Sequence, residues 1–118
     1  MKRQRAERGG RRAERLAAWW LRLKGWRILA VRARTPVGEV DLVARRGRTL
    51  AFIEVKARAG DAEAGLALDD YRLRRVARAA EALSARYGRD GDTIRIDAMF
   101  MVPGRWPRHM TDVWRGMT

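Results

Sequence analysis

The stretch GEVDLVARRGRTLAFIEVKAR, residues 38–58, alternates twice between apolar and polar side chains, once on each side of Gly47. This alternation predicts two β-strands, 37–44 and 49–58, that a tight turn joins into a hairpin. Four charged residues interrupt the apolar pattern of the strands: Glu39, Asp41, Glu54 and Lys56. Because burial of charge in a sheet is costly, these positions indicate either a functional site or an ion-pair cluster.

The hairpin brings carboxylates together in either of two registers. A two-residue loop at Arg46-Gly47 sets Glu39 opposite Glu54, whereas a loop over 46–49 sets Asp41 opposite Glu54. Like charges that face one another destabilise a sheet by roughly 0.2 to 1 kcal/mol per pair, so a cation is expected between them. Lys56 is one candidate. A divalent metal is another, and oxygen ligands without histidine or cysteine favour Mg²⁺ or Mn²⁺. Spacing alone leaves the metal site and the ion-pair cluster equally open.

The chain is strongly basic, with a formal net charge of +13 over 118 residues and a sequence pI near 11.6. Such a protein attracts polyanions, and nucleic acid is the first partner to consider. An anionic membrane surface is less favoured, because no expected helix pairs a strongly apolar face with a lysine-rich one. Of the 27 basic residues 24 are arginine, so a GC-rich genome explains part of the charge.

Cysteine is absent, and no apolar run approaches the ~20 residues of a membrane span. The basic N-terminus lacks the apolar core of a secretory signal. We therefore expect a cytoplasmic protein with no membrane partner. Its length allows one domain. We expect a flexible basic arm over 1–12, where Gly9-Gly10 would break a helix, and a domain over 13–118.

The remaining segments alternate between helical and strand patterns. The spacing predicts a helix over 11–24, whose core-facing stripe is Leu16, Trp19, Trp20 and Leu23. A strand over 26–34 precedes the hairpin. A second helix runs from Asp69 or Asp70 to Tyr87, and a strand follows over 93–102. Thr111 or Asp112 is expected to begin a last helical turn. This order predicts an α/β fold, a single sheet flanked by helices.

Other residues carry weaker signals. Glu14 lies at the edge of an apolar arc of the first helix, and from the residues alone an acid favoured by the helix dipole explains it. Trp19, Trp20 and Trp26 are expected in the core rather than as platforms for stacked bases. His109 is expected to be a surface residue. The roles of Trp106 and Trp114 stay open.

Several motifs together resemble a known family. Val40-Asp41 and Glu54-Val55-Lys56 look like the PD-(D/E)XK nuclease motif, with valine in place of proline. Over about residues 10–115 the chain more closely resembles the YraN family of small bacterial proteins. The matching pieces are Ala13-Glu14, Arg32 to Arg34, the 38–58 stretch, the arginine-rich helix ending in Ala79-Ala80, and Arg95-Ile96-Asp97. The family is similar in turn to archaeal Holliday-junction resolvases. Arg72 departs from the lysine expected at its position.

The resemblance implies a restriction-endonuclease-like α-β-β-β-α-β core with a central mixed sheet. It implies a metal-dependent endonuclease that hydrolyses DNA phosphodiester bonds, with structured or branched DNA as a candidate substrate. Asp41 and Glu54 would bind Mg²⁺ or Mn²⁺ together with the Val55 carbonyl. Glu14 would approach the metal directly or through water, and Lys56 would orient or activate the attacking water. Glu39 would either be structural or contact the metal ligands without binding the metal itself.

The expected DNA contacts are arginines that bind phosphates without reading sequence. They are Arg32, Arg34, Arg58, Arg74, Arg75 and Arg78. Dimerisation is expected by analogy with the resolvases alone. A protein on the same fold that binds nucleic acid without cleaving it, or a nuclease directed at RNA, would explain the same sequence.

Overall fold

A computed structural model describes the backbone of residues 2–57 and 70–114, and the side chains of 10–57 and 71–114. The elements in chain order are α1 (Lys2–Leu23), β1 (Arg27–Thr35), β2 (Gly38–Arg46), β3 (Thr49–Ala57), α3 (Asp70–Tyr87), β4 (Thr93–Met101) and β5 (Arg108–Met110). The expected order of helix, three strands, helix and strand is confirmed, and one further short strand follows it.

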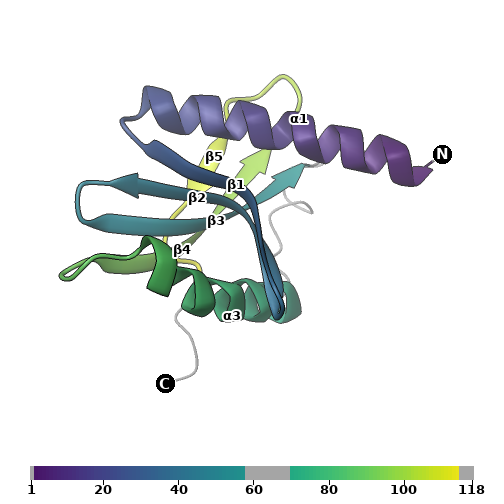
Figure 1. Ribbon diagram of the computed structural model, residues 1–118. Coiled ribbons are helices and arrows are strands. Elements are labelled where there is room, and N and C mark those ends of the chain that lie inside the picture. The colour runs from purple at the N-terminus through teal and green to yellow at the C-terminus, as the bar shows by residue number, and fades with distance from the viewer. Residues whose placement is uncertain (1, 58–69, 115–118) are drawn as a thin grey trace.

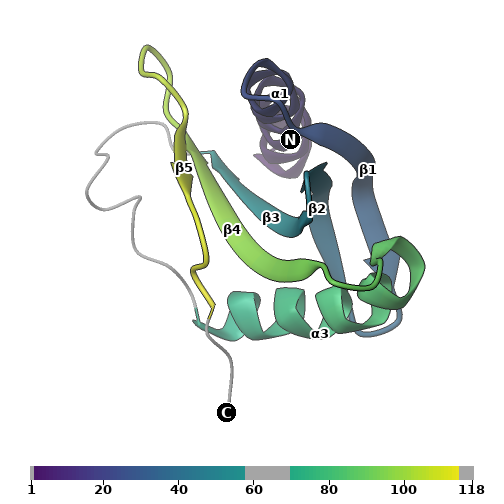
Figure 2. The same cartoon turned by 90° about the vertical axis from the view of Figure 1, so that its left-hand side faces the viewer.

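One five-stranded sheet, ordered β1-β2-β3-β4-β5, forms the centre of the molecule. The pairs β1–β2, β2–β3 and β4–β5 are antiparallel, whereas β3 and β4 are parallel. Helix α1 covers one face of the sheet and α3 covers the other (Figures 1 and 2). The predicted mixed α/β sheet between helices is therefore confirmed.

The two faces of the sheet bury separate apolar clusters. The cluster beneath α3 is built from strand residues and from one face of that helix: Val40, Val43, Leu50, Phe52, Leu73, Val76, Ala79, Ala80, Leu83 and Ile96. The cluster beneath α1 consists of Ala17, Ala18, Leu21, Trp26, Leu42, Ala44, Ala51, Ile53 and Met99. Burial of both faces explains why residues 42–44 of β2 and 50–53 of β3 are apolar without interruption.

Helix α1 differs from the prediction in its start. It begins at Lys2 rather than at Arg11, and its backbone continues through Gly9 and Gly10. Glycine weakens a helix interior by only about 1 kcal/mol each, so two glycines did not end it. The side chains of 1–9 lie outside the described residues, and the boundary of the domain at residue 13 stays a prediction.

The buried face of α1 is also not the predicted one. Leu16, Trp19 and Leu23 are 51%, 63% and 70% exposed, and Trp20 is only partly buried. The helix instead packs on the sheet through small side chains and one leucine, which are Ala13, Ala17, Ala18 and Leu21. Of the three tryptophans expected in the core, only Trp26 is fully buried.

The C-terminal segment forms strand β5 before the expected final helical turn. Residues 111–114, where that turn was expected to begin, are not helical, and its remainder lies outside the described residues. His109 is not a simple surface residue, because its Nε2 lies 2.7 Å from Oδ2 of the fully buried Asp97. Asp97 also accepts hydrogen bonds from Arg95 and from the Asp112 backbone N–H. Burial by itself raises the pKa of Asp97, but these hydrogen bonds outweigh it and lower that pKa. The carboxylate thus fastens β5 to β4.

Candidate active site

The β2–β3 hairpin adopts the register in which Asp41 lies opposite Glu54. Backbone pairing runs from Arg46 and Thr49 to Leu42 and Ile53. Beyond this pair a side chain replaces the backbone as the hydrogen-bond acceptor: Oδ2 of Asp41 accepts a hydrogen bond of 2.8 Å from the Val55 N–H. The β2–β3 ladder therefore ends at a carboxylate, beside the Glu54-Val55-Lys56 motif.

Glu54 is a buried carboxylate with two cations on one oxygen. Lys56 Nζ and Arg72 Nε both lie 3.2 Å from Glu54 Oε1. Glu54 and Lys56 are each only 3% exposed, because β3 lies in the middle of the sheet. Oε2 of Glu54 is buried and has no hydrogen-bond partner among the described residues. A buried carboxylate oxygen without such a partner can bind a cation or accept a hydrogen bond from a water molecule.

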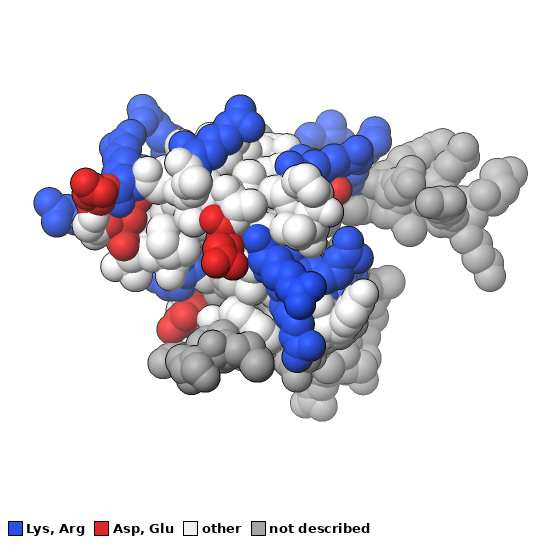
Figure 3. Space-filling view, turned by 60° about the horizontal axis from the view of Figure 1, so that its bottom comes forward, with Lys and Arg blue, Asp and Glu red and all other residues white. Residues whose placement is uncertain are grey.

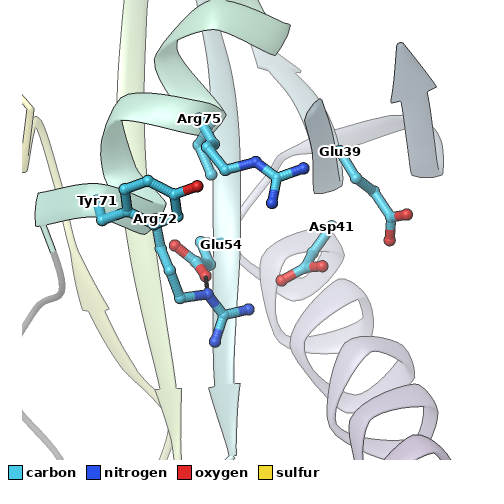
Figure 4. Close-up of a pocket in the computed structure, with 7 residues that line it drawn as sticks. Glu39, Asp41, Glu54, Tyr71, Arg72 and Arg75 are labelled. Carbon is cyan, nitrogen blue, oxygen red and sulfur yellow. Dashed lines mark ion pairs between the residues drawn. The ribbon is translucent and has the colours of Figure 1, made fainter. Parts of the chain in front are cut away.

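Asp41 and Glu54 line a cavity of about 220 Å³ together with residues of α3. The helix contributes Tyr71, Arg72, Arg75 and Val76, and Glu39 completes the lining. Figure 4 shows the Arg72 and Arg75 side chains extending from α3 toward the carboxylates of the strands. The cavity thus brings three carboxylates from the strands, those of Glu39, Asp41 and Glu54, together with two guanidinium groups from α3.

Burial, above all, raises the pKa of Asp41 from 3.8 to about 6. The negative charges of Glu14 and Glu54 raise it further, while the Val55 N–H and Arg72 oppose the shift. An acid that resists ionisation because it is partly buried beside other acids marks a place where a cation would be stabilised.

Glu14 reaches the same region from α1. It is 7% exposed and contributes to the raised pKa of Asp41. Its Oε1 accepts a hydrogen bond of 2.7 Å from Arg32 Nε. Arg32 has a positive φ of 54°, a left-handed conformation that is uncommon for a non-glycine residue. Glu14 thus lies close enough to Asp41 to raise its pKa, and Arg32 holds the Glu14 carboxylate.

The structure separates the other predicted residues. Arg34 pairs with Glu39 at 3.2 Å, and both side chains are exposed. Arg75 lines the cavity, whereas Arg74 and Arg78 line a second recess of about 320 Å³ beside Trp114. Arg58 lies outside the described residues. The face drawn in Figure 3 carries several clusters of Lys and Arg and smaller groups of acids.

Two polar residues of the cavity, Tyr71 and Arg72, were missed as site residues from the sequence. Tyr71 gave no signal, because an exposed tyrosine at the start of a helix is unremarkable. Arg72 did give a signal, because it stands where the family resemblance leads us to expect a lysine. Its guanidinium keeps the positive charge that pairs with Glu54.

The donor set fits a hard divalent cation. No three His, Cys, Asp or Glu side chains within 10–57 and 71–114 converge into a metal cage. Mg²⁺ does not require one, since it is usually held by one or two carboxylates and keeps several waters. The open Glu54 Oε2 and the Asp41 carboxylate supply two oxygens, so the residues present fit Mg²⁺ or Mn²⁺.

The fold is similar to that of a protein whose structure has been solved. Hjc, a Holliday junction resolvase from the archaeal hyperthermophile Archaeoglobus fulgidus, has a similar structure with a TM-score of 0.59. The match covers 85% of this chain and 73% of Hjc at 22% sequence identity. The protein therefore shares the fold of Hjc.

The chain belongs to the family described as "Uncharacterised protein family UPF0102", whose model matches residues 13–101. This is the YraN family, so the resemblance is confirmed. A UPF0102 protein of Sphingopyxis alaskensis is 64% identical over 115 residues, covering 98% of this chain and 99% of the relative. Those of Erythrobacter litoralis and Caulobacter vibrioides are 56% and 47% identical, covering 98% and 94% of this chain and 99% and 90% of the relatives. No helix among the described residues is long and apolar enough to cross a membrane.

Proposed function

We propose that the protein is a metal-dependent endonuclease that hydrolyses phosphodiester bonds in DNA, with branched DNA as its preferred substrate. The observation that carries this proposal is the meeting of Asp41, Glu54 and Lys56 where the β2–β3 ladder ends, with one buried Glu54 oxygen left open. The likeness to Hjc supports the choice of DNA, because that protein acts on Holliday junctions.

Asp41 and Glu54 would hold Mg²⁺ or Mn²⁺, with the Val55 carbonyl as a further oxygen. When bound, the metal would polarise the phosphoryl oxygen and lower the pKa of a bound water. The chain's own residues prepare the site. The Val55 N–H fixes the Asp41 carboxylate, and Lys56 and Arg72 hold Glu54 by Oε1 so that Oε2 stays available.

Lys56 would orient the attacking water, since its compact ammonium group lies beside Glu54 on the same face of β3. Arg72 and Arg75 would bind the phosphate that enters the cavity and offset its negative charge. Glu14 would support the site from beyond Asp41 without binding the metal directly. The hydrogen bond from Arg32 sets the position of the Glu14 carboxylate. Glu39 would shape the rim through its pair with Arg34.

The test incubates the purified chain with single-stranded, duplex and four-way-junction DNA and with duplex RNA, each with Mg²⁺, Mn²⁺ or EDTA. We expect metal-dependent cleavage that is fastest on the junction. Asp41→Asn and Glu54→Gln should each lower the rate at least about a hundredfold, because each removes a charged ligand. Asp90→Asn, an exposed acid in the turn before β4, is the matched control and should cleave normally.

Equal cleavage by the chain and by Asp41→Asn would identify a contaminating nuclease and contradict the proposal. Junction binding without cleavage under every metal condition would instead favour the non-catalytic binding protein. Cleavage confined to RNA would identify the substrate as RNA.

A further inference from the structure

Helix α1 exposes an apolar face that the core does not use. Leu16, Trp19 and Leu23 lie on this face, and all three are more than half exposed. Trp20 is the next residue along α1 and is turned about 100° from Trp19 around the helix axis. Its ring packs on the ring of Trp106 with a centroid distance of 5.4 Å. Trp106 lies in the connection between β4 and β5 and is 81% exposed. We refer to Trp19, Trp20 and Trp106 as the tryptophan platform.

Cations surround the tryptophan platform. Lys24 Nζ lies 4.7 Å from the centre of the Trp20 ring. Arg12 and Arg15 are exposed and fall on the same side of α1 as Trp19 by the helical period. Arg105 and Arg108 are exposed on either side of Trp106 in the chain. The only acid among the described side chains of α1 is Glu14, which is buried on the opposite face.

We propose that the tryptophan platform binds unpaired nucleotides of single-stranded nucleic acid by stacking their bases on the indole rings. Exposed aromatic rings bordered by Lys and Arg are the usual means of binding a single strand, because every base has a flat face and every nucleotide a charged phosphate. In a duplex the bases stack on one another and cannot reach such rings.

The charges argue against a second copy of the chain as the occupant of this face. A two-fold contact through α1 would bring Arg12, Arg15 and Lys24 of both copies together without an exposed acid among the described side chains of the helix to offset them. A strand of phosphates neutralises the same groups. The inference is independent of the proposed nuclease reaction, since it uses neither the metal nor the cavity residues.

The test measures binding of a labelled oligo-dT of about 15 nucleotides, an oligo-rU of equal length and a duplex of the same length, all in EDTA. Trp19→Ala and Trp106→Ala should each raise the dissociation constant for the single strands by at least about fivefold, as expected for loss of one stacked base. Duplex binding should change less than about twofold. Single strands should also quench the tryptophan fluorescence of the unaltered chain.

Two controls accompany these variants. Trp19→Phe keeps an aromatic ring and should retain single-strand affinity within about threefold. Ile94→Ala removes an exposed apolar side chain of β4 and should have no effect. Unchanged single-strand affinity in both alanine variants would overturn the inference, as would an equal loss of duplex affinity. Sedimentation that shows a dimer broken by Trp19→Ala would overturn it in favour of a contact between two copies.

Discussion

The carboxylate of Asp41 accepts a hydrogen bond from the backbone N–H of Val55 at 2.8 Å, where the pairing of β2 with β3 stops. The contact satisfies a donor that the ladder has left unpaired, but it also places a carboxylate in a partly buried position near Glu14 and Glu54. A residue held in this way is expected to cost stability and to serve function.

Replacement of Asp41 by asparagine should stabilise the metal-free chain at neutral pH. Because folding raises the pKa of this carboxyl from 3.8 to about 6, the folded state binds the proton more tightly than the unfolded state. Its contribution to stability is therefore lost as pH rises from about 4 to 6. The amide side chain has no charge to bury, so Asp41→Asn should gain about 3 kcal/mol at pH 7.5 and almost nothing at about pH 4.

Urea unfolding in EDTA at both pH values measures this gain. Glu39→Gln is the control, because that carboxylate is exposed and paired with Arg34. A loss of stability in Asp41→Asn at neutral pH would show that the ionised carboxylate stabilises the fold.

The ion pair between Arg45 and Asp92 should stabilise the fold at neutral pH, whereas ionised Asp41 destabilises it. Arg45 donates to both oxygens of Asp92, at 2.8 and 2.7 Å, and also to the Tyr87 carbonyl. These hydrogen bonds, with one from the Arg89 N–H, lower the pKa of Asp92 from 3.8 to about 2. The stability they provide is present above about pH 4 and is lost as pH falls toward about 2.

The urea midpoint of Asp92→Asn should therefore lie below that of the unaltered chain at neutral pH, and the difference should shrink below about pH 4. Asp90→Asn, in the same turn but exposed, should match the unaltered chain. A constant difference throughout the acid range would mean that Asp92 acts by packing rather than by charge.

Gly38 allows α3 to lie close to β2. A Cβ at this position would stand 2.7 Å from the Arg75 carbonyl oxygen and 3.4 Å from Ala79 Cβ, so the helix backbone would have to move. Gly38→Ala should destabilise the chain by about 1 to 3 kcal/mol. Gly10→Ala in α1 meets nothing closer than 3.9 Å and should instead gain up to about 1 kcal/mol. Thermal unfolding distinguishes the two, and equal effects would refute the predicted contact.

Arg75 should contribute one phosphate contact to DNA binding. Its guanidinium lines the cavity opposite Asp41 and Glu54. Arg75→Ala should weaken binding and reduce the slope of log affinity against log salt by about 0.9, the value for one released counterion. Arg48→Ala, exposed at the far end of the β2–β3 hairpin, is the matched control. If both variants change the slope equally, the arginines act through net charge and not through position.

Sequence reasoning predicted the order of elements, the hairpin and the meeting of Asp41 with Glu54, because strand alternation and a short turn fix which side chains can face each other. It left two registers open, since the chain alone does not say which residues enter the turn. The register that sets Asp41 opposite Glu54 is the one observed, and the turn itself is Gly47-Arg48, because Arg46 pairs with Thr49.

The face of α1 could not be read from the sequence. Leu16, Trp19, Trp20 and Leu23 form the more apolar stripe, yet α1 lies on the sheet through alanines. Small side chains allow the close approach that brings Glu14 near Asp41, and the larger ones are left on the surface.

By itself the sequence determined that charged side chains would gather on one hairpin within an α/β sheet, because these patterns depend on neighbours along the chain. Only the tertiary structure decided which cations reach Glu54, that Arg32 holds Glu14, and that the tryptophan platform is exposed. These relationships join residues of different elements, and their geometry follows from how the helices pack on the sheet.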